Sequence, residues 1–133
     1  PNGVLAVQVP YIQAAPFYQI LSSLVQEEPW KKLRSAYPFH NLLPEEYYQL
    51  LEEMGCSFTL WETTYFHCVP NLNGVIEWYK GSGLKPYLSR LTPEEQEAFL
   101  SALAEKMEPF CPSTPKGTVI LKMPRLFFVA SQP

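Results

Sequence analysis

Two stretches far apart in the chain predict its fold: residues 61–70, WETTYFHCVP, and residues 118–130, TVILKMPRLFFVA. Both are rich in β-branched and aromatic residues and are flanked by turn-forming residues, a pattern typical of β-strands. The residues between them, 71–117, show helical periodicity punctuated by prolines. We therefore expect two antiparallel neighbouring strands that carry a helical insertion between them, and such an insertion is suited to cover a site on the strands.

The chain opens with a short, almost wholly apolar run, residues 4–9 (VLAVQV), which Pro10 closes. A strand that is apolar on both faces is typical of the interior of a parallel sheet, where helices cover both sides. Such a strand needs neighbours on both of its edges. Because no residue ahead of it can cover it or pair with it, we expect the chain to begin within a domain.

Apolar spacing predicts two helices ahead of residue 57. The first runs from about Phe17 to Glu28, and the residues after it, 29–43, lack sustained periodicity and predict a mobile or irregular connection. The second helix begins at Pro44 and ends near Gly55. Its expected buried stripe consists of Tyr47, Leu50, Leu51 and Met54.

Three local signals mark the second half of the chain. Asn71 is suited to cap a helix, and Thr92, followed by proline and by Glu95, predicts a capping box at the start of another. Pro124 lies inside the last strand and lacks the amide hydrogen that a β-ladder uses. We therefore expect a bulge or an interruption at that proline.

Length and composition bound the class of protein. With 133 residues, 47% of them hydrophobic, the chain suits one domain with an apolar core. We expect an α/β fold in which residues 1–70 and 117–133 form the sheet portion and residues 71–116 form the helical insertion. The formal net charge of −3 argues against a nucleic-acid partner, which requires a basic face.

The cysteines and the hydropathy pattern bear on location. Cys56, Cys68 and Cys111 have spacings that match neither a zinc site nor a redox pair, so we expect free, mostly buried thiols in a reducing cytoplasm. No apolar run reaches the roughly 18 residues of a membrane helix, and no membrane partner is expected.

Several motifs together resemble a known family. They are the strings WETTYFH at 61–67, VIEW at 75–78, SGLKP at 82–86 and PRLFFVA at 124–130, with NGVLAVQVP at 2–10. In this order they resemble the C-terminal half of the trans-aconitate 2-methyltransferases, within the class I S-adenosylmethionine-dependent methyltransferase superfamily. The resemblance weakens over residues 11–43 and 107–117.

The resemblance implies a fold and an activity. It implies the C-terminal part of a Rossmann-like sheet with an antiparallel final hairpin, and methylation of a carboxylate of trans-aconitate or a similar small polycarboxylate. It also implies S-adenosyl-L-methionine as the cofactor. The chain has no Gly-x-Gly-x-Gly run, so the N-terminal cofactor-binding half is absent and its main residues are expected upstream of residue 1. We expect the isolated chain to be inactive.

The chemistry of carboxylate methylation indicates which residues are suited to bind the substrate. A carboxylate is already ionised at neutral pH, so its methylation requires no general base, and we assign no catalytic residue. Recognition of several carboxylates requires positive groups and hydrogen-bond donors, among which arginine binds a carboxylate best in a paired geometry. The expected substrate-binding residues are Arg125, His67, Tyr65, Trp78 and Lys85.

Other interpretations stay open. Arg125 is also suited to pair with a surface acid, His67 to bond a backbone carbonyl, and Trp78 to pack in a core. The chain as a whole could be a non-enzymatic protein-interaction module, or a methyltransferase that acts on a different carboxylic acid. We also expect self-association through the exposed first strand and the apolar helix faces.

Overall fold

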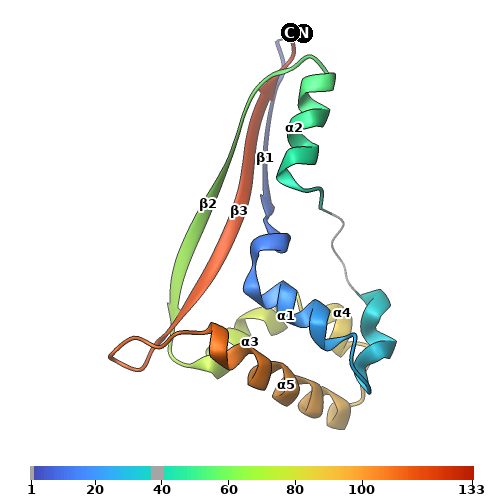
Figure 1. Ribbon diagram of the computed structural model, residues 1–133, viewed down its shortest axis with the longest axis vertical. Helices are drawn as coiled ribbons and strands as arrows, with labels where there is room; N and C mark the ends of the chain where they lie inside the picture. Colours follow the sequence, from blue (N-terminus) through green and yellow to red (C-terminus); the bar gives the residue numbers. More distant parts are fainter. Residues whose placement is uncertain (1, 37–40) are drawn as a thin grey trace. The chain divides into compact units, whose positions relative to one another are not determined.

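The computed structural model describes residues 2–36 and 41–133 (Figure 1). The part of the predicted irregular connection that covers residues 37–40 lies outside the described residues. The chain divides into two compact units, one made of residues 1–15, 40–65 and 122–133, and the other of residues 16–39 and 66–121. The boundary crosses two strands, so both contribute to both units.

A three-stranded antiparallel sheet in the order β1-β3-β2 organises the first unit. Strand β1 spans Val4–Pro10, β2 spans Ser57–Val69 and β3 spans Val119–Ser131. The two stretches that predicted the fold are therefore neighbouring antiparallel strands with helices between them, and the predicted α/β class is confirmed.

The pairing of β1 differs from the prediction. We expected an interior strand of a parallel sheet, but β1 runs antiparallel to β3, from Val4 opposite Ser131 to Pro10 opposite Arg125. It is an edge strand of the described sheet, and Val4 and Leu5 are 68% and 56% exposed. The apolar run correctly indicated a strand, but its pairing direction depends on β3, whose position is fixed by residues far away in the sequence.

Helix α2, Pro44–Glu53, lies between β1 and β2 in the chain and ends as predicted. Gly55 has a left-handed φ of 69°, and the amides of Cys56 and Gly55 bond the carbonyls of Leu51 and Glu52, which is a Schellman motif. The predicted buried stripe is half right, because Leu51 is buried and Tyr47 is half-buried against the same cluster. Leu51 packs against Phe128 and Ala130, whereas Leu50 and Met54 are 46% and 63% exposed.

Strand β3 passes through Pro124 without the predicted interruption. Its register with β1 is regular down to Pro10 opposite Arg125, and the Tyr11 amide then donates to the Pro124 carbonyl. A residue in a strand directs its N–H and C=O to the same side. The missing amide hydrogen of Pro124 therefore falls on the β1 side, just past the end of that strand, and interrupts no ladder bond there.

Helices build the second unit. Helix α1 spans Pro16–Leu24, α3 spans Leu72–Lys80, α4 spans Lys85–Leu88 and α5 spans Pro93–Met107. The unit also has 3-10 turns at Trp30–Ala36 and Glu108–Phe110. A further 3-10 turn, Ile12–Ala14, lies in the first unit. Helix α1 contacts α5, so it belongs with the inserted helices, although the sequence grouped it with the sheet portion. Phe17, Phe99 and Leu103 are fully buried in this unit.

The predicted irregular connection is ordered where it is described. Trp30, Leu33 and Ala36 are buried along one side of the 3-10 turn, and Trp30 packs edge-on against Phe99 with ring centroids 5.1 Å apart. Both predicted caps are confirmed: the Asn71 side chain accepts from the Gly74 amide at 2.9 Å, and Thr92 forms a complete capping box. Helices α3 and α5 thus start where the sequence predicts.

Candidate functional site

Arg125 and Tyr65 share one face of the sheet in the first unit. Phe128 packs against α2, so the alternation of side chains along β3 turns Phe127 and Arg125 to the opposite face. Trp61 stacks on Phe127, with centroids 5.4 Å apart and planes within 6°, which assigns Trp61 to that face as well. Tyr65 is four residues beyond Trp61 on β2, so its side chain lies on the same face. This face therefore carries Arg125, a half-buried residue, together with the aromatic residues Trp61, Tyr65 and Phe127.

The register places Arg125 opposite Pro10, the last residue of β1. Open α/β sheets bind their ligands beyond the carboxyl ends of the strands. Arg125 thus lies at the end of β1 where a ligand is expected, and Gln8 lies two residues earlier on the same strand.

Two side-chain amides secure this end of β1, and sequence reasoning missed both. Asn41 donates from Nδ2 to the Pro10 carbonyl at 2.8 Å, and Gln13 donates from Nε2 to the Asn41 carbonyl at 3.1 Å. Together they tie the turn after β1 to the segment that leads into α2. The partners are 28 and 31 residues apart, so no local pattern announces them.

The other predicted residues lie in the second unit. The rings of His67 and Trp78 are in contact, with centroids 5.4 Å apart and planes tilted by 35°. Both side chains are exposed, Trp78 by 45%, so this tryptophan is not a core residue, whereas its neighbour Tyr79 is buried against Phe17. Lys85 is the exposed first residue of α4.

The predicted site therefore falls into two groups. Arg125 and Tyr65 share a sheet face in one unit, and His67 contacts Trp78 in the other, which also holds Lys85. The structure brings together the members of each pair. The expectation that all five residues bind one substrate stays a prediction.

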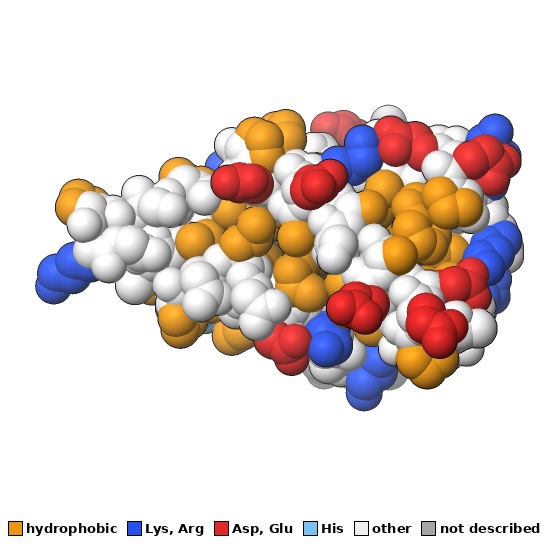
Figure 2. All heavy atoms as spheres, turned by 90° about the horizontal axis from the view of Figure 1, so that it is seen from below, with side chains coloured by type: hydrophobic (Ala, Val, Ile, Leu, Met, Phe, Trp, Pro, Cys, Tyr) orange, Lys and Arg blue, Asp and Glu red, His pale blue; other side chains and the backbone are white. Residues whose placement is uncertain are grey.

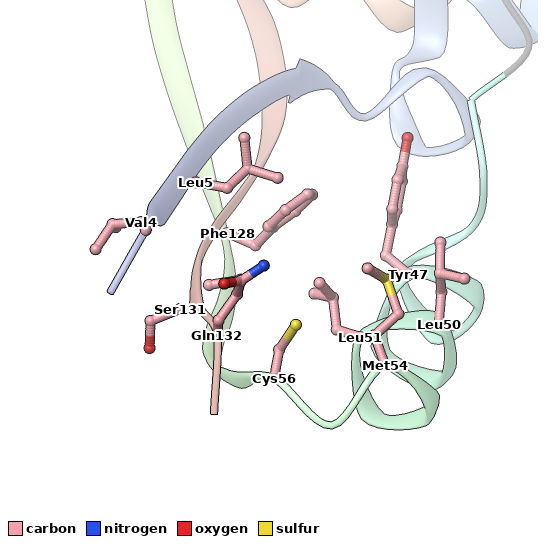
Figure 3. A pocket seen from close by; sticks show the side chains of 12 residues that line it. Val4, Leu5, Tyr47, Leu50, Leu51, Met54, Cys56, Phe128, Ser131 and Gln132 are labelled. Carbon is pink, nitrogen blue, oxygen red and sulfur yellow. The ribbon is translucent and has the colours of Figure 1, made fainter. Parts of the chain in front are cut away.

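A large apolar pocket of about 530 Å³ opens in the first unit (Figure 3). Leu5, Phe128 and the α2 side chains Tyr47, Leu50 and Met54 face one another across it (Figure 3). It adjoins Gly3, Val4 and Gln132, at the amino end of β1 and away from Arg125. None of the described residues that line this pocket is charged. S-adenosylmethionine carries charged groups, ribose hydroxyls and a hydrogen-bonding base, so these walls do not fit it.

Acidic and basic side chains alternate around apolar ones on the face shown in Figure 2. The ion pairs given by the described residues lie in the second unit and join Lys31 to Glu28, Lys32 to Glu95, Lys80 to Glu77, and Lys106 to Glu27. The neighbouring lysines Lys31 and Lys32 are thus both paired with acids. Exposed pairs of this kind add little stability.

Within residues 2–36 and 41–133, no group of three or more His, Cys, Asp or Glu side chains is arranged to hold a metal ion. No helix in that part of the chain is long and apolar enough to cross a membrane. The three cysteines are free, as predicted, but not mostly buried. Cys68 is exposed, Cys56 and Cys111 are half-buried, and burial raises the pKa of the Cys111 thiol.

Comparison with known proteins finds methyltransferases. The chain is 35% identical over 130 residues to the trans-aconitate 2-methyltransferases of Shigella dysenteriae, Shigella flexneri and Escherichia coli. The alignment covers 98% of this chain and 50% of each relative, so the chain spans about half the length of the curated relatives it matches. No family model matches the chain. The resemblance expected from the motifs is confirmed, and it is consistent with the C-terminal part of that methyltransferase.

Proposed function

We propose that this chain forms the substrate-side part of an S-adenosylmethionine-dependent O-methyltransferase that esterifies one carboxylate of a small polycarboxylic acid such as trans-aconitate. The observation that carries the proposal is 35% identity over 98% of the chain to trans-aconitate 2-methyltransferases. Because the chain spans half the length of these relatives, the activity is proposed for a longer protein that includes it. The chain alone is expected to be inactive.

In this proposal the residues of the chain recognise and orient carboxylates, and S-adenosylmethionine supplies the methyl group. Arg125 is the first candidate because its guanidinium can bind a carboxylate through two parallel hydrogen bonds. It is half-buried on a strand and lies opposite the carboxyl end of β1. A partly desolvated cation on a rigid element attracts a carboxylate more strongly than one in bulk water.

The second unit offers a separate set of groups for a further carboxylate. His67 and Lys85 provide donors, and the exposed ring of Trp78 in contact with His67 supplies an apolar surface beside the imidazole. We propose that His67, Trp78 and Lys85 contact the substrate together with Arg125 and Tyr65. Methylation of an ionised carboxylate requires no general base, so these residues need only position the substrate.

The alternative acceptor, a fatty or other monocarboxylic acid, would require an apolar pocket close to a single cation. The large apolar pocket lies at the amino end of β1, whereas Arg125 lies opposite Pro10 at the other end of the strand. This separation favours the polycarboxylate.

The test is a methyl-transfer assay on the longest natural polypeptide that contains this chain, with radiolabelled S-adenosylmethionine and matched panels of polycarboxylic and fatty acids. The expected result is a labelled ester of trans-aconitate, with fatty acids as poor acceptors. Preferential labelling of a fatty acid would identify a fatty acid, and not trans-aconitate, as the methyl acceptor. No labelling of any acid would favour a protein-interaction module.

A binding measurement tests whether the cofactor site lies within this chain. Isothermal titration of the 133-residue chain with S-adenosylhomocysteine is expected to show no tight binding, because the main cofactor residues are proposed to lie outside it. A micromolar dissociation constant would place the cofactor site within these residues. The proposed location is the cytoplasm, where three free cysteines are stable as thiols.

A further inference from the structure

Contacts within the first unit set the register between β2 and β3. Trp61 stacks on Phe127, with ring centroids 5.4 Å apart. Four residues back along β2 and four residues on along β3, the Ser131 hydroxyl donates to the Ser57 carbonyl at 3.4 Å. Antiparallel strands advance in step, so both contacts agree on one register, in which Trp61 lies opposite Phe127.

In this register Thr63 lies directly opposite Arg125. On the other side of Arg125, β1 places Pro10. Directly opposite residues share a face of the sheet and have Cβ atoms about 4.5 to 5.5 Å apart. Arg125 therefore stands between two short, uncharged side chains, and all three residues are half-buried. Because β3 is the central strand, both neighbours belong to the described sheet, and no further strand can take their places.

Among its described residues, the first unit offers no acid on the face of Arg125. Its acidic residues are Glu62 and the glutamates of α2. Helix α2 packs against Phe128 on the opposite face, and Leu60 packs there as well, so Glu62, two residues further along β2, lies on that face. A cation that is partly removed from water is stabilised by a nearby negative charge. A carboxylate from outside the unit is thus the expected partner of Arg125.

We propose that Thr63 is a specificity-determining residue for the acceptor: its hydroxyl donates to the carboxylate that the Arg125 guanidinium binds, and its small, uncharged side chain leaves the guanidinium available for that carboxylate. This inference rests on the proposed function and adds a residue to it. A hydroxyl has one donor and two acceptor sites, so it can bond the carboxylate and the guanidinium together. An acid at this position would instead form a cross-strand ion pair with Arg125.

The neighbours of Thr63 on its face of β2 are both aromatic. Trp61 and Tyr65 each lie two residues away, which is about 7 Å along a strand. They are 42% and 44% exposed, so their rings rise beside the short threonine. A carboxylate that reaches Arg125 from the β2 side therefore lies over Thr63, with an aromatic residue on either side.

The experiment is isothermal titration of trans-aconitate into the longest natural polypeptide that contains this chain, with S-adenosylhomocysteine present. Thr63→Val keeps the shape of the side chain and removes the hydroxyl, so we expect the dissociation constant to rise about tenfold. Thr63→Ser retains the hydroxyl and should stay within about threefold of the wild type.

Thr63→Glu tests the charge. Its carboxylate should pair with Arg125 and raise the dissociation constant at least about tenfold above that of Thr63→Gln, which adds the same bulk without charge. Thr59→Glu is the matched control, because Thr59 is an exposed residue on the same face of β2. It lies about 13 Å from Thr63, beyond the screening length of about 8 Å at physiological salt, and should change the constant less than about threefold.

Equal dissociation constants for the wild type, Thr63→Val and Thr63→Glu overturn the proposal, and Arg125 would then be paired with an acid from elsewhere in the longer polypeptide. A loss in Thr63→Val that recurs in full in Thr63→Ser overturns the role of the hydroxyl. Titration measures binding without methyl transfer. Binding of trans-aconitate that depends on Thr63 in a polypeptide that methylates no acid would contradict the proposed function alone, whereas methylation of trans-aconitate that is indifferent to Thr63 would contradict this inference alone.

Discussion

The indole of Trp61 and the phenyl ring of Phe127 stack across β2 and β3, with centroids 5.4 Å apart and planes within 6°. The pair shares its sheet face with Arg125 and Tyr65, and it joins the two strands that were expected from the sequence to be neighbours. Trp61 is still 42% exposed, so burial of its surface supplies only part of the interaction.

A double-mutant cycle can measure this stack. We expect Trp61→Ala and Phe127→Ala to be coupled by about 1 kcal/mol, the magnitude of an aromatic pair beyond area burial. Urea unfolding of the single and double variants provides the four free energies. Val129→Ala in combination with Trp61→Ala is the control, since Val129 lies on the same face two residues further along β3. Strictly additive effects for the first pair would show that the stack contributes nothing of its own.

The bond from Asn41 to the Pro10 carbonyl predicts a second effect. Asn41→Ala removes the donor, and we expect a loss of about 1 kcal/mol of unfolding free energy. Asn41→Asp should cost at least as much, because a carboxylate cannot donate to the carbonyl. The Tyr11 amide, which bonds the Pro124 carbonyl beside this tie, should exchange faster in both variants. Unchanged exchange at Tyr11 would mean that the tie does not hold the end of β1.

Gly83, in the SGLKP motif, predicts a packing effect. An added Cβ there would lie 2.8 Å from the Tyr18 hydroxyl and 3.2 Å from its ring, and that ring is held edge-on against Phe17 and Tyr79. We expect Gly83→Ala to destabilise the chain by about 1 to 3 kcal/mol through overpacking. Gly81→Ala is the control, because its Cβ would meet its nearest atom, the Trp78 carbonyl, at 3.7 Å. Equal unfolding midpoints for the two variants would contradict the argument.

Glu95 predicts a pH dependence. Its hydrogen bond with Lys32 and its bond to the Thr92 backbone lower the pKa of this carboxyl below the ordinary value of 4.5. A group with a lowered folded pKa stabilises the fold fully above its unfolded pKa and loses that contribution as pH falls through the folded pKa. The stability difference between the wild type and Glu95→Gln should thus be constant well above pH 4.5 and shrink below it. Denaturant unfolding at a series of pH values measures this, with Glu94→Gln as the control.

Local signals account for what could be predicted from the sequence. The caps at Asn71 and Thr92 and the helix end at Gly55 depend on residues within one turn of each other, and all three are where they were expected. The 3-10 turn at Trp30–Ala36 was not predicted, although its signal is local: Trp30, Leu33 and Ala36 recur every third residue, which is the period of that helix. A search limited to the α-helical period missed it.

Partners distant in the sequence account for what was missed. The direction in which β1 pairs is set by β3, more than a hundred residues later, and the tie at its end is set by Asn41. An apolar position on a helix is buried only where something covers it. Leu50 and Met54 follow the same period as Leu51, but among the described residues they border an open pocket. The grouping of Arg125 with Tyr65 was predictable from the alternation along paired strands.

Arg125 provides the sharpest test of the proposed site. In the longer polypeptide for which methyl transfer is proposed, Arg125→Lys keeps the positive charge but loses the paired hydrogen bonds. We therefore expect kcat/KM for trans-aconitate to fall about tenfold or more, since a hydrogen bond to a charged group contributes about 1.5 to 3 kcal/mol. Arg125→Met should lower it further, and a monocarboxylic acceptor should lose less than a tricarboxylic one. Lys122→Arg, an exposed change on the same strand, is the control and should have no effect. Equal losses for Arg125→Lys and Arg125→Met with an unchanged ratio between acceptors would make Arg125 a structural residue of β3, and recognition of the carboxylates would then depend on His67 and Lys85.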